Sequence, residues 1–79
     1  MATFVTTVLD HQGKPRAGVL VEIAQTLYEP LRAHTDARGK ASFHVRPGVP
    51  VIYMRAGARQ DPRRLYPVCD SGEEVTLKT

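Results

Sequence analysis

The same turn signal occurs twice in this chain, and alternation of apolar and polar residues begins shortly after each copy. Residues 10–14 (DHQGK) and 36–40 (DARGK) both read Asp-x-x-Gly-Lys. In such a turn the Asp carboxylate accepts a hydrogen bond from the backbone N–H two residues later, and glycine supplies a positive φ. Alternation with period two is typical of strands that bury one face. The two segments therefore predict the corners of a small antiparallel β-sandwich.

Alternation between frequent glycines and prolines predicts short strands and no helix along the whole chain. In the fifth strand it places Ile52 and Met54 in the core and leaves Val51 outside. Residues 57–64 are expected to form an irregular basic loop. The seven expected strands are residues 3–9, 19–25, 31–35, 40–46, 50–56, 65–68 and 73–77. The residues expected to shape turns and bends are Asp10, Gly13, Pro15, Gly18, Asp36, Gly39, Pro47 and Gly48.

Length and composition predict one domain with a thin core. At 79 residues the chain is near the lower limit at which a hydrophobic core alone stabilises a fold. It has three Tyr, two Phe and no Trp, so Val, Leu, Ile and Ala must fill most of the interior. We therefore expect additional stabilisation from other protein subunits or from self-association into a homo-oligomer.

The sequence shows no segment that would direct it to or through a membrane. Its first residues lack a basic region followed by an apolar stretch, and no apolar run approaches the length of a membrane span. A single cysteine, Cys69, excludes an internal disulfide. We expect a cytoplasmic protein, or one incorporated into a larger particle, without membrane insertion.

Several motifs resemble the transthyretin-like and carboxypeptidase-regulatory-like group of Ig-like sandwiches. That group's pattern is Val-x-Asp, Gly-x-Pro, Gly-Val-x-Val, Thr-Asp-x-x-Gly-x-x-x-Phe and Pro-Gly. In this chain these motifs are residues 8–10 (VLD), 13–15 (GKP), 18–21 (GVLV), 35–43 (TDARGKASF) and 47–48 (PG). The resemblance implies an all-β, seven-stranded, Ig-like Greek-key sandwich. It implies no single function, because modules of this kind occur as appendages on peptidases, transporters, adhesins and virion proteins.

One catalytic branch of this group, the hydroxyisourate hydrolases, differs from this chain at each motif element. Those enzymes have a His before Val-Leu-Asp, an Arg after the second Asp–Gly turn, and a C-terminal Tyr-Arg-Gly-Ser. The corresponding positions here are Thr7, Lys40 and the ending Glu-Val-Thr-Leu-Lys-Thr. We therefore do not carry that activity over.

The remaining reactive side chains form no pattern typical of catalysis or metal binding. Cys69 would act as a nucleophile only beside an activating group, for which Arg63 and Arg64 are the candidates in the sequence; the favoured interpretation is a small, buried or half-buried apolar residue. The three histidines lack the spacing of a metal site on one element; they are His11, His34 and His44. We expect no enzyme activity, no cofactor and no metal.

Arginine and tyrosine on exposed strand positions suggest a protein-contact face. Both residue types are enriched at the energetic centres of interfaces. The competing interpretation is an ordinary solvated polar face. Nucleic-acid binding is disfavoured, since the net charge is only +3 and the basic residues form no continuous run. The expected contact residues are His44, Arg46, Tyr53, Arg55, Arg63, Arg64 and Tyr66.

The sequence thus favours a non-enzymatic structural or interaction module, an accessory subunit of a larger protein assembly. A capsid decoration or tail accessory protein of a phage or phage-like virion is one concrete form of this hypothesis. The alternative is a module that binds a small ligand or a carbohydrate. The absence of Trp argues against sugar stacking.

Overall fold

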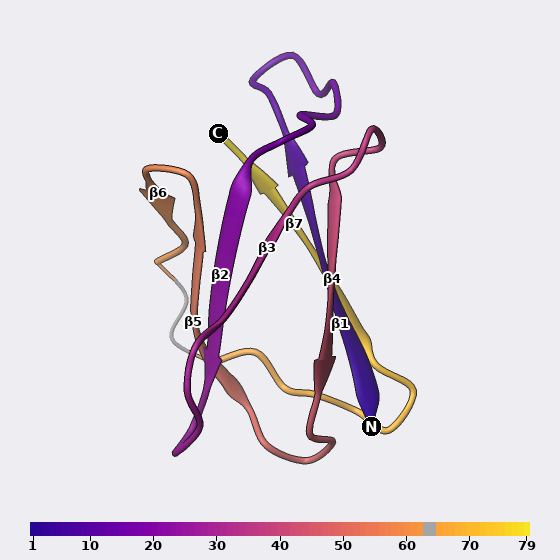
Figure 1. The fold of residues 1–79 in the computed structure, drawn as a ribbon, viewed down its shortest axis with the longest axis vertical. Helices are drawn as coiled ribbons and strands as arrows, with labels where there is room; N and C mark the ends of the chain where they lie inside the picture. The colour runs from indigo at the N-terminus through magenta and orange to yellow at the C-terminus, as the bar shows by residue number, and fades with distance from the viewer. Residues whose placement is uncertain (63–64) are drawn as a thin grey trace.

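Two β-sheets pack face to face in the computed structural model, which describes residues 1–62 and 65–79 (Figure 1). Within these residues the strands are β1 (Ala2–Leu9), β2 (Leu20–Gln25), β3 (Leu31–His34), β4 (Lys40–Val45), β5 (Val51–Ala56), β6 (Arg59–Gln60) and β7 (Glu73–Lys78). A three-stranded sheet has the order β4-β1-β7, and a four-stranded sheet has the order β3-β2-β5-β6. The predicted all-β, seven-stranded sandwich is therefore confirmed.

The core lies between the sheets and is built largely from small aliphatic side chains, as the composition predicts. Phe4 of β1 is fully buried and meets Tyr66 edge-on, with ring centroids 6.1 Å apart. Thr6, the next inward residue of β1, is also buried and donates from Oγ1 to Sδ of Met54 (3.2 Å). The other large buried side chains include Val8, Val21, Ile23, Val45 and Val51.

The pairing of β1 and β7 departs from the expected antiparallel arrangement. β1 runs antiparallel to β4 but parallel to β7, with a register from Phe4↔Glu73 to Leu9↔Lys78. The first and last strands of the chain are therefore neighbours that point the same way. As a result, the two ends of the chain lie at opposite ends of the molecule's long axis (Figure 1).

A β-bulge in β5 reverses the predicted orientation of two side chains. Ala24 pairs with Tyr53, whereas the next residue, Gln25, pairs with Val51, so Ile52 is an extra residue. A bulge of this kind changes the side-chain parity of the strand. Val51 is consequently buried and Ile52 exposed, the opposite of the prediction, while Met54 lies beyond the bulge and is buried as expected.

The sixth strand lies earlier in the chain than predicted. It is β6, which falls within the segment expected to be an irregular loop and pairs antiparallel with β5. Residues 65–68 form only an isolated bridge between Tyr66 and Val51, in place of the expected strand. Pro67 has no backbone N–H with which to extend the pairing.

Both Asp-x-x-Gly-Lys turns have the predicted hydrogen bonds. Oδ1 of Asp10 accepts from the backbone N–H of Gln12 and of Lys14 (both 2.9 Å). Oδ1 of Asp36 accepts from the N–H of Arg38 (2.8 Å) and of Lys40 (3.0 Å). These bonds, above all those from Lys14 and Lys40, hold the pKa of each carboxyl below its ordinary value.

The other predicted turn residues also lie in connections between strands. Gly13, Gly18, Gly39 and Gly48 all have positive φ, as their expected positions require. Pro15 forms an isolated bridge with Leu9 in the long β1–β2 connection. Pro47 and Gly48 form the turn that follows β4.

Acid is expected to destabilise the fold partly through these carboxylates. A carboxyl whose pKa is lower in the folded than in the unfolded chain stabilises the fold at neutral pH. This contribution is lost as the pH falls from about 5, where unfolded carboxyls begin to bind protons, down through the lower folded pKa values. The free energy of unfolding, measured by urea titration between pH 7 and pH 2, should therefore decrease in acid. The variant Asp10→Asn/Asp36→Asn keeps the acceptor oxygens but cannot titrate, so its decrease should be smaller. An equal decrease in both proteins would contradict the role of the turns.

Candidate functional site

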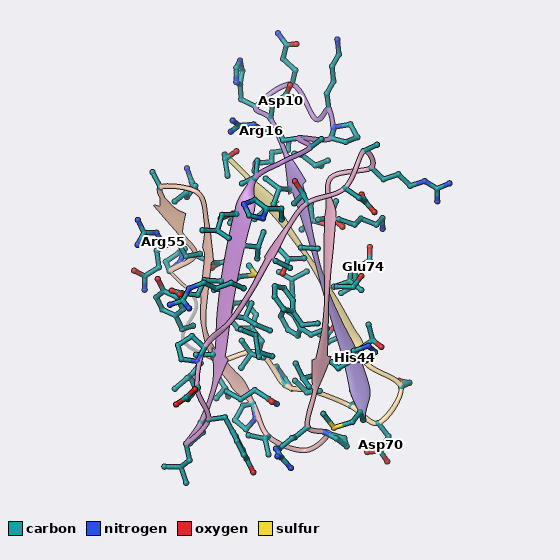
Figure 2. All side chains as sticks on the ribbon, in the orientation of Figure 1. Asp10, Arg16, His44, Arg55, Asp70 and Glu74 are labelled. Atoms are coloured by element: carbon teal, nitrogen blue, oxygen red, sulfur yellow. The ribbon has the colours of Figure 1, made fainter. Side chains whose placement is uncertain are left out.

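The structure divides the predicted contact residues between two separate surfaces. His44 lies on β4 in the three-stranded sheet, and Arg46 directly follows that strand. Tyr53 and Arg55 lie on β5 in the four-stranded sheet. Figure 2 shows His44 and Arg55 on opposite sides of the molecule. The prediction that these residues share one contact face is therefore wrong.

Two further predictions for this face have different outcomes. Tyr66 is only 1% exposed, because the bulge in β5 turns Val51 inward and the bridge to Val51 holds the tyrosine over the core. It is a core residue, so its place on an exposed contact face is wrong. Arg63 and Arg64 lie outside the residues that the structure describes.

Tyr53 and Arg55 share the outer face of the four-stranded sheet, which we name the β5 face. In the register of the two strands, Arg55 lies opposite Glu22 and Tyr53 lies opposite Ala24 of β2. Glu22 also forms an ion pair with Arg32 of β3 (2.6 Å), and Nε of Arg55 donates to the carbonyl of Gly57 (2.9 Å). The charged groups of this face thus already interact with one another or with the backbone.

His44 and Arg46 line a groove on the open side of the sandwich, between the edge strands β3 and β4. The groove has a volume of about 250 Å³, and its lining is mostly apolar. It receives residues from both sheets and from the β2–β3 turn. Its full lining is Met1, Ile23, Gln25, Tyr28, Glu29, Leu31, His44 and Arg46.

The wall of the groove is fixed by one cation–π contact of Arg46 and three hydrogen bonds of Gln25. The guanidinium of Arg46 lies over the ring of Tyr28, 4.5 Å from its centroid, in a cation–π contact. The backbone of Arg46 is held by the buried amide of Gln25, which accepts from its N–H (3.1 Å) and donates to its carbonyl (2.9 Å). The same Gln25 nitrogen donates to the carbonyl of Val49 (2.8 Å). The β2–β3 turn and the β4–β5 connection therefore meet at this end of the groove.

The turn beside the groove contains a strained and exposed leucine. Leu27 has φ +67° and is 97% exposed, and it is the one non-glycine residue with positive φ among those described. A left-handed backbone costs a residue such as leucine about 1–2 kcal/mol. Leu27 is next to the groove in the chain but is not part of its lining, whereas three large apolar side chains of the lining are exposed as well: Met1, Tyr28 and Leu31. We call Met1, Leu27, Tyr28 and Leu31 the apolar rim.

One side of this site was predicted from the sequence and the other was not. His44 and Arg46 were expected at exposed strand positions, whereas residues 27–30 lie between two expected strands and were not among the expected contact residues. The detectable signal was the pair Leu27 and Tyr28, two large apolar residues where a polar turn is usual.

Other chemistry is sparse in the part of the chain that the structure describes. Among residues 1–62 and 65–79, no three His, Cys, Asp or Glu side chains are grouped closely enough to hold a metal ion. Cys69 is a free, exposed thiol, so the expectation that it is buried or half-buried is wrong. Within the same residues, no helix has the length and apolar character needed to cross a membrane.

Comparisons with known proteins bear on the fold. No protein-family model matches the sequence, and no curated protein matches it. Among solved structures, the C-terminal fragment of the pilus adhesin SpaC from Lactobacillus rhamnosus GG is similar, with a TM-score of 0.58 at 12% sequence identity. The similarity covers 98% of this chain but only 43% of that fragment. At this identity the likeness shows a shared architecture, an Ig-like β-sandwich.

Proposed function

We propose that this chain is a non-enzymatic interaction module that binds a protein partner through the groove and its apolar rim. The observation that carries the proposal is Leu27, which is both strained and almost fully exposed. A packed partner would remove this side chain from water, which would offset the strain of its backbone. Burial of Leu27 together with Tyr28 and Leu31 would form the apolar centre of an interface.

The charges around the groove define the chemistry of the proposed partner. His44 and Arg46 lie on one side, and Glu29 is the acidic residue in the lining. An apolar segment with an acidic residue beside it would match this arrangement. The carbohydrate alternative is less well supported, because Arg46 already covers one face of the Tyr28 ring on which a sugar would stack.

We infer that the setting is a larger protein assembly, and a phage or phage-like virion, assembled in the cytoplasm, is the concrete form that we propose. A small, thin-cored module with an exposed apolar rim suits an accessory subunit that is completed by its neighbours. The transthyretin-like type remains our proposal for its subgroup within the Ig-like sandwiches. It is supported by the two Asp-x-x-Gly-Lys turns, whose side-chain oxygens and glycines have the geometry that the motif requires.

Leu27→Gly is expected to weaken partner binding while leaving the fold intact. Relief of the left-handed strain, about 1–2 kcal/mol, is opposed by the greater flexibility of glycine in the unfolded chain, about 0.5–1 kcal/mol. The free energy of unfolding should therefore stay within about 1 kcal/mol of the wild-type value. Binding should fall by about tenfold or more, as for removal of an interface hot spot. The measurement is co-sedimentation of tagged protein with particles from a lysate of the native host, with mass spectrometry of its companions.

The matched control is Tyr53→Ala/Arg55→Ala, which alters the β5 face on the other side of the molecule. This variant should sediment with the particle like the wild type. If it is lost while Leu27→Gly is retained, the β5 face is the contact surface and the proposal for the groove is wrong. If wild-type protein sediments alone, the proposed assembly is wrong.

A further inference from the structure

We propose that a cleft beside the β5–β6 hairpin is a second binding site, which takes the phosphate group of a small organic phosphate. β3 and β4 are the edge strands beside the groove, whereas this cleft lies toward the opposite edges, β6 and β7 (Figure 1). It is formed by the β1–β2 connection, the β5–β6 hairpin and Thr79, which follows β7. Its volume of about 440 Å³ is within the range of sites that hold small molecules.

The placement of Arg59 is the first observation that points to an anion. Arg59 lies opposite Ala56 in the register of β5 and β6, and residues opposite each other in an antiparallel pair have their side chains on the same face. Ala56 is buried between the sheets, so Arg59 belongs to the inner face of its sheet. Because β6 is an edge strand, Arg59 stays exposed at the open border of the sandwich. An arginine at a position where the inner face usually has an apolar side chain suits a charged ligand.

A second guanidinium reaches the cleft from the β1–β2 connection. The backbone of Arg16 is fixed, because its N–H donates to the carbonyl of Val8 (2.9 Å) and its carbonyl accepts from Oγ1 of Thr35 (2.6 Å). Nη1 of Arg16 donates to Oγ1 of Thr79 (2.7 Å), and the N–H of Thr79 donates to the carbonyl of Leu9 (2.9 Å). A guanidinium has five N–H donors, and a hydroxyl that accepts one bond can still donate another. Both side chains can therefore bond a ligand without losing the bond between them.

The lining of the cleft carries positive charge without an acidic residue. Among the residues that the structure describes, the lining contains two arginines and no aspartate or glutamate. The groove differs because it contains Glu29, and the hollow beside Leu20 on the β5 face contains Glu22. Neither Arg16 nor Arg59 forms an ion pair with an acidic side chain among residues 1–62 and 65–79. Both guanidinium charges are therefore available to an anion.

The chemistry of the cleft favours a phosphate monoester over a carboxylate. The planar fork of a guanidinium binds either group through two parallel hydrogen bonds. A phosphate monoester carries about −1.5 to −2 elementary charges at neutral pH and has three strong acceptor oxygens. It therefore matches two guanidiniums and a hydroxyl better than a carboxylate does. Val19 and Ala56 supply an apolar part of the lining, against which the organic part of the ligand would pack.

Titration with phenyl phosphate, followed by two-dimensional NMR of the backbone amides, tests for the site. This compound joins a phosphate monoester to a small apolar ring. In about 0.15 M NaCl, which screens charges beyond about 8 Å, we expect saturable shifts at residues 16 and 56–59. Benzoate has the same ring but a single charge and two acceptor oxygens, so its Kd should be at least about threefold higher. No saturable shift at these residues would overturn the site, and equal binding of the two compounds would overturn its assignment to phosphate.

Arg59→Gln should raise the Kd for phenyl phosphate by about tenfold or more, because it removes one of the two charged forks. The control is Arg38→Gln, which makes the same chemical change in the β3–β4 turn, outside the lining of the cleft. Its Kd should stay within about twofold of the wild-type value at this salt concentration. An equal loss in the two variants would mean that net charge alone attracts the phosphate, and there would be no site.

A third variant separates this proposal from the one for the groove. Leu27→Gly changes the apolar rim, on the side of β3 and β4, and should bind phenyl phosphate like the wild type. A loss in Leu27→Gly as large as that in Arg59→Gln would overturn the assignment of phosphate to the cleft. The groove is tested by co-sedimentation and the cleft by NMR titration, so either proposal can fail while the other holds.

Discussion

Replacing Gly39 with alanine is expected to lower the free energy of unfolding by about 3 kcal/mol, a large part of the total available to a chain of this size. Gly39 has φ +77°, and an alanine Cβ there would lie 2.6 Å from the carbonyl oxygen of Val8 and 3.1 Å from the backbone nitrogen of Arg16. The left-handed backbone alone costs an alanine about 1–2 kcal/mol. Crowding against two backbone atoms adds roughly 1–3 kcal/mol, because backbone cannot move aside like a flexible side chain.

The chain contains its own matched control for this prediction. Gly13 occupies the same position in the other Asp-x-x-Gly-Lys turn and has φ +86°, but a Cβ there would meet nothing within 4 Å. Gly13→Ala should therefore show only the backbone penalty, about 1–2 kcal/mol. Urea titration of both variants measures the difference. If the two lose equal stability, the close approach of Gly39 to the Val8 backbone has no energetic consequence and the prediction is wrong.

The pair of turns also shows what the sequence could and could not predict. The turns themselves could be predicted from the local sequence: both aspartates and both glycines were expected to form turns, and both turns are present. The difference in space around Gly39 and Gly13 could not be predicted, because the two glycines belong to the same motif. It arises where the β3–β4 turn packs on Val8 and Arg16, a contact between segments far apart in the chain.

Non-local pairing explains the main errors in the fold as well. Alternation in β5 is interrupted by one extra residue, Ile52, and no residue in that segment is of a type that would predict a bulge. The partner of β7 could not be inferred, because its parallel neighbour is the first strand of the chain. Tyr66 was expected on the exposed contact face because of the basic residues near it in the sequence. Its buried place against Phe4 depends on that bulge and on the bridge to Val51, which the local sequence does not predict.

The candidate site was half predictable for the same reason. The exposed position of Arg46 followed from simple alternation along β4. The partners of Arg46 could not be predicted in this way. Tyr28 lies in the β2–β3 turn. Gln25 is the last residue of β2 and faces inward, where alternation predicts an apolar side chain. A polar residue at an inward position requires hydrogen-bond partners, but the sequence does not say which segment supplies them.

Gln25→Leu is expected to lower the free energy of unfolding by about 2–4 kcal/mol, although leucine is apolar and similar in volume. The amide of Gln25 bonds three backbone groups, the N–H and carbonyl of Arg46 and the carbonyl of Val49. Leucine can bond none of them, and each buried group left without a partner costs about 1–3 kcal/mol, less where water can reach it. The carbonyl of Arg46 keeps one bond, from the N–H of Val49 (3.4 Å), which limits the total.

The same substitution should also loosen the groove, because Gln25 fixes the backbone from which Arg46 reaches the ring of Tyr28. Gln60→Leu makes the same chemical change at an exposed position on β6 and should shift stability by less than about 0.5 kcal/mol. Urea titration of the two variants, with the tyrosine environment followed by NMR, separates a specific effect from a general one. Since Gln25 ends a strand of one sheet and binds the connection that follows a strand of the other, a wild-type stability for Gln25→Leu would mean that packing alone joins the sheets at this end.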